Sequence, residues 1–122
     1  MNSKPALKLA EVQSFVSDLS RARVFYEQTL GLSLKQAGGS WLIFDLNGLE
    51  FIVMGGAKPV NPPEYGSQAV TVLCLETPDI EQTVKNLRHA GVYFLTSIKR
   101  VAQGAFAAFK DPDGNMIELI QR

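Results

Sequence analysis

Residues 111–119 read Asp111-Pro112-Asp113-Gly114-Asn115-Met116-Ile117-Glu118-Leu119 and close the second of two similar half-sequences. They combine a turn, in which Pro fixes φ and Gly accepts positive φ, with a strand that carries a Glu between two large apolar residues. The earlier stretch Asn47-Gly48-Leu49-Glu50-Phe51 ends the first half in a similar way. Each stretch follows a helix-like pattern that opens at an Asp and stops at a Gly. The sequence therefore predicts a duplicated half-domain.

The first half is predicted to fold as a strand, a helix and three further strands. Ser17 or Asp18 can accept a hydrogen bond from the free amides that open the helix. Apolar residues then recur at helical spacing, and Gly31 supplies a left-handed stop. Asn47-Gly48 predicts the tight turn of a hairpin. The expected strands are 11–16, about 32–36, 41–44 and 49–54.

The second half repeats this order. Asp79 is expected to cap its helix, with Gln82 as the capping-box partner, and Gly91 to end it. The expected strands are 70–75, about 93–98, 105–109 and 116–121. We expect module one to cover about residues 8–56, a Pro-rich linker about 57–67, and module two about 68–122.

Composition narrows the class of protein. A chain of 122 residues is long enough for one core, and its formal net charge of zero gives no basic footprint for nucleic acid. No segment approaches the ~20 apolar residues of a membrane span, and the start, Met1 to Pro5, lacks the apolar core of a signal peptide. Cys74 is the only cysteine, which fits a reducing cytoplasm; within an apolar run it is expected to be buried.

A known superfamily is similar in both motifs and order. The resembling residues are Val16-Ser17-Asp18-Leu19, Phe25-Tyr26, Leu30-Gly31-Leu32 and the run from Phe109 to Leu119. Together they resemble the vicinal oxygen chelate superfamily, which includes glyoxalase I, bleomycin-resistance proteins and extradiol dioxygenases. The resemblance implies an α+β fold of two βαβββ modules, whose partly open curled sheets surround a cleft. It also implies a homodimer.

The resemblance places functional side chains on the first and last strand of each module. Carried over, these are Glu11, Glu50 and Glu118, with the fourth position near Val72, or Val70 in the alternative register. Strand alternation independently puts the three carboxylates on the face turned away from the helices. Oxygen ligands suit Mg, Mn or Ca. A divalent metal there would serve a lyase or isomerase, with Glu50 and Glu118 as the candidate catalytic residues.

Two observations weigh against the metal. The related metalloenzymes mostly supply at least one His, and the only His of this chain, His89, falls in the last turn of the second helix. There it is expected to be a surface residue that favours the helix C-terminus. A strand Glu is also often a solvated residue or an ion-pair partner, here of Arg100 or Lys110. An extradiol dioxygenase is excluded, because its metal site needs two His and one carboxylate and this chain has a single His.

The favoured prediction is a protein that binds a small organic ligand in an apolar cleft, in the glyoxalase/bleomycin-resistance class. A metal-dependent lyase or isomerase is the alternative, and whether the chain is an enzyme stays open. Trp41 and Tyr65 are the most informative candidates for ligand binding. Alternatively, Trp41 covers the sheet and Tyr65 anchors its loop. The candidate ligand-binding residues are Phe15, Trp41, Phe44, Tyr65, Phe106 and Arg100.

Overall fold

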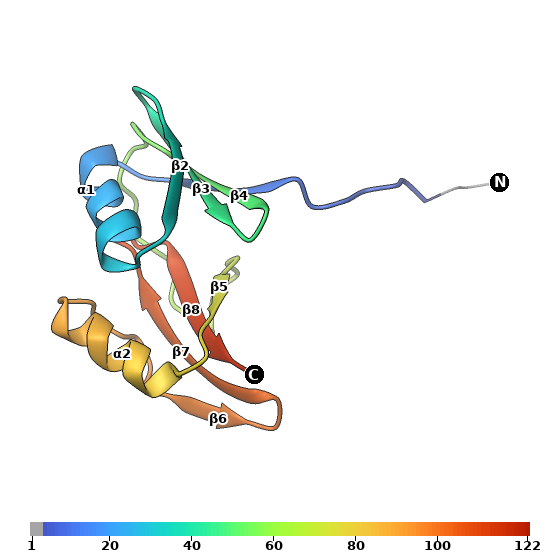
Figure 1. Ribbon diagram of the computed structural model, residues 1–122, viewed down its shortest axis with the longest axis vertical. Coiled ribbons are helices and arrows are strands. Elements are labelled where there is room, and N and C mark those ends of the chain that lie inside the picture. Colours follow the sequence, from blue (N-terminus) through green and yellow to red (C-terminus); the bar gives the residue numbers. More distant parts are fainter. Residues whose placement is uncertain (1–3) are drawn as a thin grey trace.

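The computed structural model describes residues 4–122. The prediction that Met1 to Pro5 lacks a signal peptide therefore falls mostly on residues outside the described ones, Met1 to Ser3. Two four-stranded sheets lie one above the other in Figure 1, each with its helix on the same side. Neither sheet closes into a barrel. This is the predicted α+β arrangement of two βαβββ units.

The first sheet has the strand order β1-β4-β3-β2. Its β1 runs parallel to β4, and the other neighbours are antiparallel. Asn47 and Gly48 both have positive φ (54° and 90°), as the predicted hairpin turn between β3 and β4 requires. The elements of this half are β1 Glu11–Phe15, α1 Leu19–Arg23, the π-helix η1 Val24–Thr29, β2 Ser33–Ala37, β3 Trp41–Leu46 and β4 Leu49–Met54.

The second sheet repeats the topology with the order β5-β8-β7-β6. Its elements are β5 Leu73–Glu76, α2 Ile80–His89, β6 Lys99–Val101, β7 Gly104–Lys110 and β8 Met116–Gln121. The predicted strand at 93–98 is wrong, because only a single bridge, between Phe94 and Phe109, forms there. In this stretch Phe94 is buried and Tyr93 is 81% exposed.

Local hydrogen bonds explain where the helices begin. The Asp18 carboxylate accepts from the Arg21 amide at 3.1 Å, and the Asp79 carboxylate accepts from the Gln82 amide at 3.1 Å. Both capping aspartates match the prediction. The predicted capping box is wrong, because the Gln82 side chain donates to Asn86 and the Asp79 amide donates to the Thr77 hydroxyl. The first helix differs from the prediction in one respect, because its second part widens into the π-helix. Phe25 and Tyr26 lie in this π-helix, with ring planes at 88°, and Tyr26 is buried.

One buried core joins the two halves. The Tyr26 hydroxyl donates to the Asp111 carboxylate at 2.7 Å, although 85 residues separate them in sequence. Phe25 packs against Phe109 with ring centroids 6.2 Å apart. The Asp113 carboxylate also accepts from the Ser17 amide at 3.0 Å. These contacts fix the second half against the first helix.

The N-terminal segment leaves the body of the protein. Residues 4–10 extend away from β1, on the side opposite the helices in Figure 1. Leu7 and Leu9 on this segment are 86% and 70% exposed. Among residues 4–122, no helix has the length and apolar character needed to cross a bilayer.

Candidate functional site

Each sheet has one face covered by a helix and one face uncovered. In the first half, α1 contacts β3 and β4. The uncovered face carries Phe15, 57% exposed, together with the half-buried Trp41, Ile52 and Met54. The predicted alternation in β1 and β4 is therefore confirmed. This face is apolar and bears two aromatic side chains.

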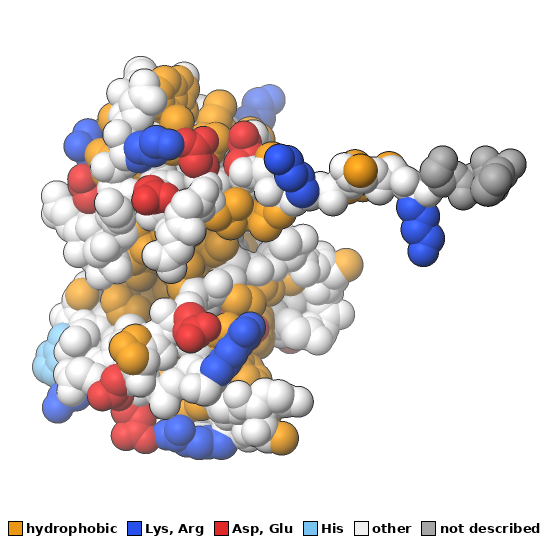
Figure 2. All heavy atoms as spheres, turned by 45° about the vertical axis from the view of Figure 1, so that its right-hand side comes forward, with side chains coloured by type: hydrophobic (Ala, Val, Ile, Leu, Met, Phe, Trp, Pro, Cys, Tyr) orange, Lys and Arg blue, Asp and Glu red, His pale blue; other side chains and the backbone are white. Residues whose placement is uncertain are grey.

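Hydrophobic side chains also gather in the hollow between the two halves (Figure 2). One cavity there, of about 470 Å³, is lined by leucines of the β3–β4 hairpin and of β5. A second, of about 290 Å³, lies between β1 and the segment leading into β5, and Phe15 and Val70 are among its lining residues. These volumes approach or reach the size that small organic ligands need.

Trp41 and Phe44 occupy opposite faces of β3. The Trp41 ring lies against the backbone of Gly38, where an added Cβ would meet it at 2.3 Å. Phe44 is fully buried beside Tyr26 and Phe51 on the helix side. The prediction of Phe44 as a ligand-binding residue is therefore wrong: alternation along β3 turns it into the core.

Two of the predicted carboxylates lie on neighbouring strands of the first sheet, where Glu11 is paired with Glu50 in the parallel register. The Glu50 carboxylate forms an ion pair with the Lys35 ammonium at 2.6 Å, and this contact raises the pKa of Lys35. The exposed Glu11 carboxylate accepts from the Gln13 side-chain amide at 2.7 Å. Both groups already have polar partners or water.

The third carboxylate, Glu118, lies on β8 of the other sheet. Its Oε2 accepts a 2.6 Å hydrogen bond from the Tyr65 hydroxyl, which reaches across from the linker. Burial, followed by this hydrogen bond, raises the pKa of Tyr65, so the phenol keeps its proton. Glu118 also lines a cavity of about 130 Å³ together with Phe106. Tyr65, Phe106 and Glu118 are thus brought together.

The three carboxylates do not form the predicted metal site. A divalent ion needs several oxygen ligands converging on one point. No group of three or more His, Cys, Asp or Glu side chains in residues 4–122 could hold a metal ion. Lys35 neutralises Glu50, and Glu118 belongs to a different sheet from Glu11. The residues present therefore do not fit a divalent metal ion.

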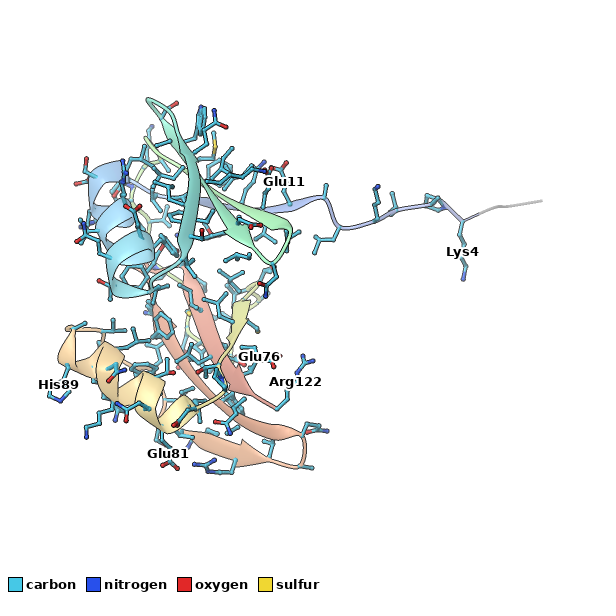
Figure 3. The ribbon with its side chains drawn as sticks, viewed as in Figure 1. Lys4, Glu11, Glu76, Glu81, His89 and Arg122 are labelled. Atoms are coloured by element: carbon cyan, nitrogen blue, oxygen red, sulfur yellow. The ribbon has the colours of Figure 1, made fainter. Side chains whose placement is uncertain are left out.

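Two further predicted residues lie away from the uncovered faces. Arg100 of β6 bonds to Glu81 of α2 and is the register partner of buried Ala105, so the structure places it on the helix side of the sheet. His89 points outward from the end of α2, on the side opposite Glu11 and Arg122 (Figure 3), as predicted for a surface residue.

The two halves correspond through a shared backbone hydrogen bond. The Val16 amide donates to the Met54 carbonyl at 2.8 Å, and the Thr77 amide donates to the Ile120 carbonyl at 2.8 Å. Val16 and Thr77 each stand two residues before the aspartate that caps the next helix. Met54 and Ile120 therefore occupy the same position in the two halves.

This correspondence shifts the predicted alignment of the last strands by two residues. It relates Glu118 to Ile52 rather than to Glu50, and Cys74 to Gln13. Cys74 is exposed on the uncovered face as the register partner of Glu118, so its predicted burial is wrong. Burial, followed by the Glu118 charge, raises the pKa of its thiol. The second half thus presents a thiol and a carboxylate where the first presents an amide and a hydrocarbon.

Sequence reasoning missed three residues of the site. Lys35 stands at the bulge between β2 and β3, and strand alternation alone does not predict its pairing with Glu50. Cys74 lies beside Glu118 because of the register in which β5 pairs with β8, whereas Arg122 directly follows β8 and lines the same cavity as Glu118. No short-range pattern signals that parallel register.

The fold is that of one superfamily. Residues 8–119 match the Glyoxalase/Bleomycin resistance protein/Dioxygenase superfamily. The match spans most of the chain, and the chain belongs to this superfamily. The predicted vicinal oxygen chelate resemblance is confirmed.

Individual relatives are similar to this chain over nearly its full length. The chain is 25% identical to the uncharacterized protein YurT of Bacillus subtilis (strain 168), an alignment covering 95% of this chain and 100% of that protein. A glyoxalase/dioxygenase structure from Nostoc punctiforme has a TM-score of 0.83 at 22% identity and covers 99% of this chain and 97% of its own. A lactoylglutathione lyase structure from Agrobacterium tumefaciens has a TM-score of 0.71 at 19% identity, covering 97% and 96%. At these identities the two structures establish the fold alone.

Proposed function

We propose that the protein binds a small organic ligand against the uncovered apolar faces of its two sheets. The observation that carries this proposal is the aromatic and aliphatic surface that no helix covers, together with the cavities along it. Phe15 is 57% exposed on that surface, an arrangement that costs free energy unless a partner covers it. Apolar walls with a few polar anchors are typical of ligand sites.

The polar anchors belong to the second half. Glu118 and Tyr65 form a hydrogen-bonded pair at the edge of the cavity that Phe106 lines. A ligand would gain affinity from the apolar walls and orientation from this pair. A metal-dependent lyase or isomerase finds no specific support, since the carboxylates of residues 4–122 do not converge.

Ligand titration tests the proposal. The fluorescence of Trp41, the only tryptophan, is recorded while a panel of small aromatic and aliphatic compounds is added. We expect saturable changes with some members, weakened several-fold by Phe15→Ala. Tyr93→Ala is the matched control, because Tyr93 is an exposed aromatic residue (81%) outside these faces. Equal weakening by both variants, or no response to any compound, would refute the proposal.

We also propose that the chain forms a homodimer. The exposed Leu7 and Leu9 of the N-terminal segment and the uncovered sheet faces are apolar surface that a second copy can bury. Light scattering of the eluted protein measures its mass. A monomer across the micromolar range would contradict this proposal without affecting ligand binding.

A further inference from the structure

Glu118 stands in a different electrostatic setting from the other two carboxylates of the uncovered faces. Glu50 is neutralised by Lys35 at 2.6 Å, and Glu11 is exposed to water. Glu118 is half-buried, and no Lys, Arg or His nitrogen of residues 4–122 lies within 4.0 Å of its oxygens. Its charge is therefore partly removed from water without a cationic partner.

The Tyr65 hydroxyl supplies a hydrogen bond but no charge. It occupies Oε2 at 2.6 Å, and Oε1 has no hydrogen-bond donor among the described residues. A carboxylate oxygen has lone pairs for further donors. The register partners of Glu118 on the two neighbouring strands, Cys74 and Ala108, carry no positive charge. The Oε1 atom of Glu118 is therefore open to water or to a donor on a ligand.

The cavity beside Glu118 is suited to a small group. Its volume is about 130 Å³, and its walls include Phe106, Ile120 and Arg122. An aromatic ring next to a carboxylate attracts a cation, because the ring face is negative. Arg122 is exposed and Lys99 lies one strand beyond Phe106, so each can stay in water.

We propose that this cavity receives the protonated nitrogen of an organic amine, with Glu118 as its counter-ion and Phe106 and Ile120 in contact with the apolar body. The inference rests on the proposed function and names the chemical class of the ligand. A primary ammonium can donate to Oε1 while Tyr65 keeps its bond to Oε2. It compensates the half-buried charge that the chain leaves alone.

Three probes of similar shape separate charge from shape: benzylamine, benzyl alcohol and benzoate. Their affinities are measured at pH 7 by chemical-shift titration of the amide spectrum. We expect benzylamine to bind about ten-fold or more tightly than benzyl alcohol, since hydrogen bonds to a charged group are worth roughly 1.5–3 kcal/mol. Benzoate should bind most weakly.

Variants locate the preference. Glu118→Gln should lower benzylamine to the affinity of benzyl alcohol, which itself should not change. Glu11→Gln, on the other sheet, is the control and should keep the full preference. Arg122→Ala should also keep it, because it leaves the Glu118 charge in place. If Glu118→Gln fails to fold, the amide shifts that benzylamine causes in the unchanged protein are the second test: they should cluster at Phe106, Glu118 and Ile120, and shifts confined to other residues would overturn the assignment.

The outcomes distinguish this inference from the function on which it rests. Equal binding of the three probes, or a preference that survives in Glu118→Gln, overturns the amine assignment and leaves the apolar ligand site standing. Tighter binding of benzoate assigns the cavity to Arg122 and also overturns it. If no probe binds while other compounds perturb Trp41, the amine assignment fails alone. If nothing binds at all, both proposals fail.

Discussion

Replacing Tyr26 with Phe tests whether the hydrogen bond between the halves stabilises the whole protein. Tyr26 is fully buried, and its hydroxyl donates to Asp111, which is 4% exposed, at 2.7 Å. Phe keeps the ring contacts with Phe25, Phe44 and Phe51 at centroid distances of 5.1, 6.0 and 5.2 Å. The change therefore removes the hydroxyl and little else.

The expected cost follows from the partners that Asp111 retains. Its Oδ1 still accepts from the amides of Asp113 and Asn115, and its Oδ2 still accepts from the Asn115 side chain at 2.8 Å. The carboxylate loses one of four donors, in a buried setting. A hydrogen bond to a charged group is worth about 1.5–3 kcal/mol, and we expect the free energy of unfolding to fall by that amount.

Urea unfolding followed by circular dichroism measures this loss. Glu27→Gln is the matched control on the same helical segment, because it breaks the surface ion pair with Arg23 at 3.0 Å. That pair should contribute only about 0.3–0.5 kcal/mol. A Tyr26→Phe protein that is no less stable than Glu27→Gln, at an unchanged denaturant slope, would show that the link between the halves does not stabilise the fold.

Four further results are expected. Burial, followed by the Asp111 charge, raises the pKa of Tyr26 in the folded protein. The Tyr26 hydroxyl therefore stabilises the fold fully below the pKa of an unfolded Tyr, about 10, and progressively less above it. In urea titrations, the stability difference between wild type and Tyr26→Phe should shrink by about 1.4 kcal/mol per pH unit above that value. Gly104→Ala should lower the free energy of unfolding by more than about 2 kcal/mol, because the added Cβ would lie 1.9 Å from the Gln121 carbonyl oxygen. Gly31→Ala, with open space at φ +72°, should cost only about 1 kcal/mol. Equal costs of the two variants in thermal unfolding would contradict this prediction. Asp79→Ala removes the cap of α2 and should cost about 1 kcal/mol, and an unchanged urea midpoint would refute the role of that cap. A chelator should leave ligand affinity unchanged in the Trp41 titration, and a loss of binding would restore the metal hypothesis.

Much of the fold could be predicted because its signals are local. The caps at Asp18 and Asp79 and the turn at Asn47-Gly48 each depend on a few neighbouring residues. Strand alternation likewise separated covered from uncovered faces. The fold prediction was weakest at 93–98, where alternating apolar residues form a nearly isolated segment rather than a strand.

The site was less predictable because it depends on contacts between distant residues. Tyr65 reaches Glu118 across 53 positions, and no pattern in the linker indicates that contact. The parallel pairing of β5 with β8 puts Cys74 beside Glu118, a register that no hairpin turn sets. Phe44 and Arg100 were assigned to the site by residue type, whereas their strand positions turn them away from it.

The different residues at equivalent positions of the two halves have a consequence for any molecule held between them. A perfectly repeated duplication would offer two interchangeable walls, and a bound molecule could sit either way round. Here the first half presents Gln13 and Ile52 at the positions where the second half presents Cys74 and Glu118. The two orientations of a bound molecule are therefore energetically unequal.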